Sequence, residues 1–266
     1  MDGVRDITIA ILAHNKEKCL PLYLQCIYNQ TYHKGNLHLY IRTNDNRDRT
    51  TEILHDWLAL VKDEYSSFYI DDSSIDKDLE QVESHDWNSH RFSILGRIRQ
   101  ESVDYAISKN SHYFVSDCDN FIHKHTLQSM YDSGKFAIAP MLPSTEAYTN
   151  FHYKVDNSGF FVECKEYYDF RYYRHKGVIA VDCIHCTYFI RDLVLPLIYY
   201  DDGTETYEYI IFSRSLRRLY IEQHIDNTSN YGKLTFNDDP SDEPWITEFY
   251  DAHFSMQFGV VQGNEL

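Results

Sequence analysis

The sequence is poor in positive charge. Its 266 residues contain 25 lysines and arginines against 41 aspartates and glutamates, which gives a formal net charge of −16. A protein that follows nucleic acid along a groove needs a basic surface, so the composition argues against this class of function. An anionic small ligand is still compatible with the acidity, because a divalent cation can bridge such a ligand to carboxylates.

Long apolar runs are also absent. No stretch approaches the roughly 18 consecutive apolar residues of a transmembrane helix. The apolar segment at residues 7–12 is too short to cross a membrane and lacks a secretory cleavage pattern. We therefore expect a cytoplasmic protein with no integral membrane segment.

Cysteines are few and scattered, at positions 19, 26, 118, 164, 183 and 186. Without a secretory signal they are expected to be free thiols. Cys183 and Cys186 have the spacing of a metal or redox pair, but no second pair accompanies them. Residues three apart on a strand do not share a face, so two core cysteines are the preferred interpretation.

Internal repeats and low-complexity linkers are missing, which favours one unit over residues 1–266. Hydrophobic content of 43% and aromatic content of 15% indicate a globular protein. The first half alternates strand patterns with helix patterns. The expected strands are 7–12, 37–42, 67–70 and 112–115, and the expected helices are 18–29, 51–61 and 90–109. This alternation predicts an α/β fold with a mainly parallel central sheet flanked by helices.

The second half is less regular. Its patterns predict strands at 136–142, 159–165, 178–190 and 219–225, and a helix at 205–218. From residue 227 onward the chain is polar, contains Pro240 and Pro244, and is expected to be rich in loops.

Two aspartates interrupt an apolar stretch in the segment YFVSDCDNFI, residues 113–122. Two carboxylates this close repel one another unless a cation lies between them. Asp117 and Asp119 can point to one side of an extended or tightly turned backbone, as ligands of a hard divalent ion do. An ordinary acidic turn is the alternative. Three further polar residues follow expected strands and would lie at the same ligand-binding edge of the sheet: Asn15, Asn44 and Asp45.

Seven short motifs occur in a fixed order: AHN at 13–15, TNDNRDRT at 43–50, RIRQ at 97–100, FVSDCDN at 114–120, APML at 139–142, AYTNF at 147–151 and IHCTYFI at 184–190. In this order the chain resembles the hydroxylysine galactosyltransferases that glycosylate collagen, in particular one of their nucleotide-sugar domains of the GT-A fold. Related proteins are the glucosyltransferase domain of lysyl hydroxylases and collagen-modifying enzymes of giant viruses. The missing secretory signal fits a viral source.

The resemblance implies a metal-dependent, inverting transferase. It would move a hexose, preferably galactose, from a UDP-sugar to a hydroxyl acceptor such as hydroxylysine in a collagen-like protein. Asp117 and Asp119 match the D-x-D motif that holds Mn²⁺, or Mg²⁺, against the donor diphosphate. Residues 1–125 would bind the nucleotide sugar, with contributions from Ala13, Asn15, Asn44, Asp45 and Arg97. Residues 126–266 would bind the acceptor, through Tyr148, Asn150 and His185, although His185 fits a core position equally well.

Two further roles follow from the resemblance. His253 is the expected third metal ligand, with His224 as the second choice, since a neutral imidazole suits Mn²⁺. The family carries an acidic pair before an apolar helix, and Tyr207 and Glu208 stand at those places. Glu208 is therefore the expected catalytic base, with Glu205 and Asp202 as substitutes. Its alternative role is to complement the N-terminus of a helix.

Other functions stay open at this point. A glucosyl- or N-acetylglucosaminyltransferase differs from a galactosyltransferase in only a few pocket contacts. A two-metal phosphodiesterase or nuclease would need more carboxylates near the aspartate pair. A sugar nucleotidyltransferase would need the glycine-rich first loop that AHNKEKCLP lacks. A degenerate, non-catalytic homologue that binds carbohydrate or nucleotide is the third alternative, because only Glu208 retains an acid of the family's acidic pair.

Overall fold

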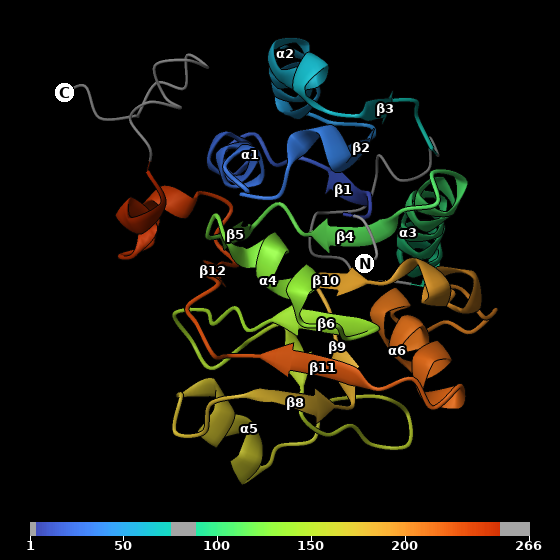
Figure 1. Cartoon of the computed structure of the whole chain (residues 1–266), viewed down its shortest axis with the longest axis vertical. Coiled ribbons are helices and arrows are strands. Elements are labelled where there is room, and N and C mark those ends of the chain that lie inside the picture. Colours follow the sequence, from blue (N-terminus) through green and yellow to red (C-terminus); the bar gives the residue numbers. More distant parts are fainter. Residues whose placement is uncertain (1–3, 76–88, 251–266) are drawn as a thin grey trace.

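The computed structural model describes residues 4–75 and 89–250 (Figure 1). Its centre is an eight-stranded sheet with the strand order β3-β2-β1-β4-β10-β6-β11-β8. The strands are β1 (Ile7–Ala13), β2 (Leu37–Thr43), β3 (Ser67–Asp71), β4 (His112–Ser116), β6 (Ala137–Pro140), β8 (Val178–Val181), β10 (Thr187–Ile190) and β11 (Gln223–Asp226).

Most strands of the sheet run in one direction. β1 pairs in parallel with β2 and β4, β2 with β3, and β6 with β11. β10 is antiparallel to its neighbours β4 and β6, and β8 is antiparallel to β11. The predicted α/β fold with a mainly parallel sheet is confirmed. The carboxyl ends of β1, β2 and β4 meet at one edge of the sheet, where ligands of such folds bind.

Helices cover both faces of the sheet: α1 (Leu20–Tyr28), α2 (Thr50–Val61), α3 (Ser89–Ser108), α4 (Thr126–Asp132), α5 (Lys165–Arg171) and α6 (Glu208–Arg218). One buried cluster joins α1, α2 and α4 to the sheet, and a second cluster on the other face includes residues of α3, α5 and α6. The two faces are filled by alternate side chains of the same strand, since Ile9 lies in the first cluster and Ala10 in the second. In Figure 1, α3 and α6 lie next to one another, and their residues are in contact.

Two short antiparallel pairs complete the described fold: β5 (Asn120–Ile122) with β12 (Gly232–Leu234), and β7 (Phe151–His152) with β9 (Cys183–Ile184). Gly232 allows the first pair to approach closely, because its φ is +144° and a Cβ there would lie 2.1 Å from the carbonyl oxygen of Phe121. This pair holds residues 232–234 against the segment that follows β4.

The second half departs from its predicted elements. Residues 178–190 form the three strands β8, β9 and β10, because the chain leaves the extended form at Asp182 and at Cys186, whose φ is +61°. Residues 159–165 are not a strand, and α5 begins at Lys165. Several short elements carry too few residues to show a pattern and were not predicted: β5, α4, α5, β7 and β12.

Among the residues that the structure describes, no helix combines the length and apolar character needed to cross a membrane. All six cysteines lie in these residues, and none of them forms a disulfide there. Cys183 is on β9 and Cys186 precedes β10, so only one of the two lies on a strand.

Candidate functional site

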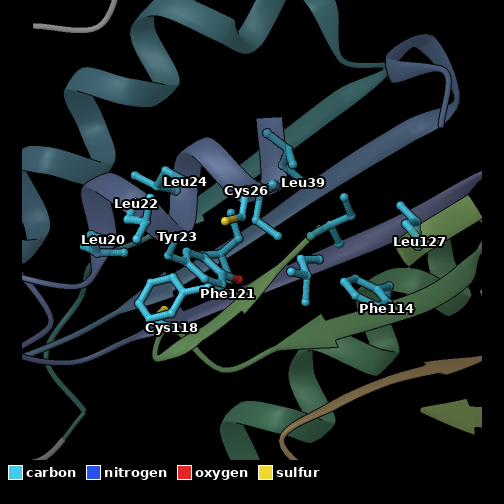
Figure 2. Close-up of a cluster of buried hydrophobic side chains, with 14 of the residues drawn as sticks. Leu20, Leu22, Tyr23, Leu24, Cys26, Leu39, Phe114, Cys118, Phe121 and Leu127 are labelled. Carbon is cyan, nitrogen blue, oxygen red and sulfur yellow. The ribbon is translucent and has the colours of Figure 1, made fainter. Parts of the chain in front are cut away.

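The two aspartates lie in the tight turn between β4 and β5. The turn is fixed through its backbone: Asp117 N donates to Cys186 O (3.1 Å), Asn120 N to Asp117 O (2.9 Å) and Thr235 N to Asp119 O (3.1 Å). Between the aspartates, Cys118 is buried in the core beside Tyr23 and Phe121 (Figure 2). Its Sγ donates to Leu12 O at 3.4 Å. With Cys118 anchored inward, the turn leaves the side chains of Asp117 and Asp119 29% and 26% exposed.

Arg99, on α3, joins Asp117 to Glu208. Its Nη2 donates to Asp117 Oδ1 at 2.8 Å and its Nε to Glu208 Oε1 at 3.3 Å. The side chains of Arg99 and Glu208 are only 11% and 8% exposed. Arg99 therefore joins two carboxylates that lie far apart in the sequence into one ionic network.

Arg97, which was predicted to face the diphosphate, does not enter this network. Its side chain is 55% exposed, and its Nε lies 3.9 Å from Glu101 Oε1 on the same helix. Residues two apart on an α-helix point about 200° apart, so Arg97 and Arg99 cannot face the same site.

Glu208 is the first residue of α6 and is buried. Burial raises the pKa of the Glu208 carboxyl, and the positive charge of Arg99 works in the opposite direction. A raised pKa suits a general base better than that of an ordinary glutamate. The two substitutes lie elsewhere: Asp202 pairs with Arg214 at 3.0 Å, and Glu205 is exposed.

Asp119 forms an ion pair with Lys16. Lys16 Nζ donates to Asp119 Oδ2 at 2.9 Å, and both side chains are 26% exposed. Burial raises the pKa of Asp119, while Lys16 opposes that rise. Each aspartate of the turn is thus paired with one basic side chain, Asp117 with Arg99 and Asp119 with Lys16.

The polar residues predicted for the uridine side lie together where β1 and β2 end. Ala13 is the last residue of β1 and is buried. Asn15 and Asp45 have left-handed backbones, with φ of +51° and +47°. Asn44 is also buried and donates from Nδ2 to Asp45 Oδ2 at 3.1 Å. Parallel pairing of β1 and β2 brings these residues to the same edge as the aspartate turn.

The predicted acceptor side divides into two parts. Asn150 is fully buried and fixes the backbone, since its Oδ1 accepts from Leu142 N and its Nδ2 donates to Pro140 O. Tyr148 is 36% exposed, and its ring centroid lies 5.6 Å from that of His185. The His185 ring in turn lies 5.2 Å from that of Tyr209, the neighbour of Glu208. Tyr148 and His185 thus form a cluster of rings with Tyr209 in the first turn of α6, whereas the side chain of Asn150 faces the interior.

The oxygen-rich aspartate pair fits a hard divalent cation such as Mn²⁺ or Mg²⁺. Within residues 4–75 and 89–250, however, no three histidine, cysteine, aspartate or glutamate side chains form a metal-binding group. His253 lies outside the described residues. His224 does not reach the site, because β11 lies three strands away from β4 in the sheet and the register places His224 level with Phe114, two residues before the end of β4. A bound cation would therefore complete its coordination with ligand or water oxygens, or with residues beyond those described.

Comparison with known proteins identifies the family. The family model for the N-terminal domain of glycosyltransferase family 25 matches residues 5–243. The chain belongs to glycosyltransferase family 25. It is 30% identical to procollagen galactosyltransferase 2 of Mus musculus over 86% of this chain and 38% of that protein. It is also 28% identical to inactive glycosyltransferase 25 family member 3 of Homo sapiens over 86% of this chain and 40% of that protein. The chain thus spans about two fifths of the length of these relatives.

Solved structures support the GT-A-like fold. The structure of S. aureus TarS 1-349 in complex with UDP-GlcNAc matches 95% of this chain and 64% of that chain with a TM-score of 0.56 and 12% identity. Apo UDP-glucose pyrophosphorylase matches 96% of this chain and 100% of that chain with a TM-score of 0.51 and 12% identity. Because both proteins share the fold, the fold alone does not assign the reaction. The cytoplasmic location, the viral source and the division into donor and acceptor halves stay predictions.

Sequence reasoning missed Lys16 and Arg99. Arg99 lies inside the recognised motif RIRQ, and Lys16 directly follows the motif AHN, but neither residue was separated from its neighbours. Helical spacing offered a signal for Arg99: it follows Leu95 by four residues, so it lies one turn farther along the same side of the helix as that apolar residue. Nothing in the sequence showed that the side chain of Lys16 reaches Asp119, because that contact joins segments 103 residues apart.

Proposed function

We propose that this family 25 chain transfers a hexose from a UDP-sugar to a hydroxyl acceptor, with a divalent cation, Mn²⁺ or Mg²⁺, held by Asp117 and Asp119. The observation that carries the proposal is the bridge made by Arg99 between Asp117 and Glu208. In this bridge one guanidinium group binds both Asp117, the candidate cation ligand, and Glu208, the candidate base. Galactose and a hydroxylysine of a collagen-like acceptor are preferred, supported by the name of the mouse relative and by the order of the sequence motifs.

Glu208 has the position and character of a general base. In the inverting reaction its carboxylate takes the proton of the acceptor hydroxyl as that oxygen bonds to the anomeric carbon. The bond between the anomeric carbon and the diphosphate oxygen breaks at the same time, and UDP leaves with that electron pair. A cation at Asp117 and Asp119 would supply charge stabilisation to the departing diphosphate.

Arg99 has an unused donor for such a ligand. Its Nη1 is buried and has no hydrogen-bond partner among the described residues, while Nη2 and Nε bind Asp117 and Glu208. A buried donor without a partner is destabilising, so an oxygen of the donor or acceptor would gain a strong hydrogen bond there. Arg99 would then hold Glu208 in place and contact the substrate as well.

A specific observation favours a second candidate, a non-catalytic nucleotide-binding homologue. Tyr207 stands where the family pattern has an acid, and its ring packs on Phe92 with centroids 4.2 Å apart. One relative at 28% identity is named as inactive. In this candidate the aspartate pair would still bind metal and nucleotide, but no hexose would be transferred.

Turnover separates the two candidates. The chain would be incubated with Mn²⁺, a hydroxylysine-containing collagen-like peptide and, in turn, UDP-galactose, UDP-glucose and UDP-N-acetylglucosamine. The proposal predicts release of UDP and a matching hexose mass on the peptide, fastest with UDP-galactose. Metal-dependent UDP binding with no transfer from any donor would favour the non-catalytic homologue. Without binding or transfer, both candidates would be wrong.

A further inference from the structure

Lys16 Nζ lies 2.9 Å from Asp119 Oδ2, one of the carboxylate oxygens that a divalent cation could bind. We propose that Lys16 is an internal counter-ion of Asp119, which leaves the carboxylate when the cation binds and then pairs with the donor diphosphate. This inference rests on the proposed function, because it assumes that a cation and a nucleotide diphosphate bind at the turn. Lys16 thereby becomes a positioning residue for the donor.

The backbone of Lys16 is held firmly, so only its side chain is free to change partners. Lys16 N donates to Thr50 Oγ1 at 2.7 Å, and Lys16 O accepts from Leu20 N at 2.9 Å at the start of α1. The neighbours on either side are tied to the loop after β2: Asn15 N donates to Asn46 Oδ1 at 2.8 Å, and Glu17 N to Asp48 Oδ2 at 3.1 Å. These bonds join the loops after β1 and β2 and fix the point from which Lys16 reaches Asp119.

The ion pair is not needed to hold the aspartate turn. Three backbone hydrogen bonds and the buried Cys118 already fix that turn, as described above. Both side chains of the pair are only 26% exposed, so the cost of removing two charges from water offsets much of their attraction. Its position beside the candidate cation site therefore calls for a role in binding.

Arg99 and Lys16 differ in their freedom. Arg99 is buried and bound to two carboxylates, which hold it in place, whereas Lys16 pairs with one carboxylate among the described residues and has a long flexible stem. Together they leave Asp117, Asp119 and Glu208 with one net negative charge. A diphosphate alone would add about two more, which is unfavourable at short range. Binding a divalent cation at the aspartates offsets that charge and releases Lys16 to the phosphates.

Two affinities test the inference in the intact chain: that for Mn²⁺ alone, from the electron paramagnetic resonance of free Mn²⁺, and that for UDP in saturating Mn²⁺, by calorimetry. Lys16→Met should tighten the binding of Mn²⁺ alone roughly threefold or more, because a competing cation is gone. It should weaken UDP binding about tenfold, because a charged hydrogen bond to phosphate is lost. Lys16→Arg should recover most of the UDP affinity. Lys18→Met, which removes an exposed lysine from the same loop, is the matched control and should change neither affinity.

The opposite changes in the two affinities are the signature of an exchange of partners. If Lys16→Met left both affinities unchanged, or weakened both, the inference would be overturned. The proposed function would still stand in that case, provided that the wild type binds UDP in a metal-dependent way. A Lys16→Met chain that does not fold, beside a folded Lys16→Arg chain, would also overturn it, since the ion pair would then be structural. A wild-type chain that binds neither Mn²⁺ nor UDP would overturn the proposed function together with the inference.

Discussion

Arg99 donates from Nη2 to Oδ1 of Asp117 across 2.8 Å, and this ion pair connects α3 to the turn that follows β4. Through Nε the same guanidinium contacts Glu208 at the start of α6. A planar group with donors on two edges can hold two carboxylates at once, which an ammonium group cannot do with the same geometry. The catalytic proposal depends on this arrangement.

Replacing Arg99 by lysine should therefore reduce hexose transfer strongly. Arg99→Lys keeps the charge but not the two-sided geometry, and we expect kcat/KM to fall on the order of 100-fold. Steady-state kinetics of UDP release measure it, and circular dichroism checks that the variant is folded. Arg97→Lys on the exposed face of the same helix is the control and should stay within about twofold of wild type. Loss of activity in Arg97→Lys with retention in Arg99→Lys would restore the original sequence prediction.

Glu208→Gln should reduce the rate of transfer about 10²- to 10⁴-fold, which is the range for removal of a general base. UDP binding in the presence of Mn²⁺ should be nearly unchanged, because the carboxylate acts on the acceptor. Transfer assays and calorimetry on the same preparation separate these two quantities. Full transfer by Glu208→Gln would assign the base elsewhere.

The pH dependence of transfer provides an independent check on Glu208. A base works only when deprotonated, so the rate falls as the pH falls through its pKa. Burial raises that pKa above the ordinary glutamate value of 4.5. We expect the acid limb of kcat/KM to lie above pH 4.5 in the wild type and to be lost from the residual activity of Glu208→Gln. An identical limb in both proteins would show that another group causes it.

Much of the fold could be predicted from the sequence, because apolar residues recur with regular strand and helix spacing in its first half. Isoleucines and leucines alternate or run continuously in β1 and β2, and α2 has a clear apolar stripe, so these elements were placed to within one or two residues. The stretch 178–190 looked like one strand because apolar residues dominate it, although Asp182, His185 and Thr187 lie among them. The break at Asp182 had a signal that was passed over, because aspartate is disfavoured in strands. The break at Cys186 depends on its left-handed backbone, which the residue type does not indicate.

The candidate site could be predicted only in part, for a related physical reason. Asp117 and Asp119 stand out because a charge pair at the end of an apolar strand is unusual. Arg99 and Lys16 do not stand out, because arginine and lysine on helices and loops are normally solvated. Their roles follow from tertiary contacts with Asp117 and Asp119, which no local pattern contains.

Gly96 allows α3 to approach the backbone of Tyr200 closely. A Cβ at this position would lie 2.7 Å from the carbonyl oxygen of Tyr200. Gly96→Ala should therefore reduce the free energy of unfolding by about 1–3 kcal/mol, as overpacking does. Because Arg99 is one turn farther along α3, transfer should fall as well. Urea denaturation measures the free energy of unfolding. An increase of about 1 kcal/mol, as expected for glycine to alanine in a helix with open space around it, would contradict the close approach.

Buried His152 should make the protein less stable in mild acid. Burial and the charge of Arg217 lower the pKa of His152 to about 4 in the folded protein, against about 6.5 when unfolded. Between these values the unfolded chain binds more protons, so stability rises with pH and is lost as the pH falls from about 6.5 toward 4. One such group contributes at most about 1.4 kcal/mol per pH unit. Thermal melting of wild type and His152→Gln should show a weaker pH dependence in the variant, and parallel curves would contradict this.

We propose above all that Asp117 and Asp119 hold a divalent cation against a nucleotide diphosphate. The decisive experiment is calorimetric titration of UDP, with and without Mn²⁺, into wild type and Asp119→Asn. Wild type should bind UDP much more tightly with Mn²⁺, and Asp119→Asn should lose at least about tenfold of this metal-dependent gain, because a charged ligand is removed. Equal UDP affinity with and without Mn²⁺, unchanged in Asp119→Asn, would contradict it.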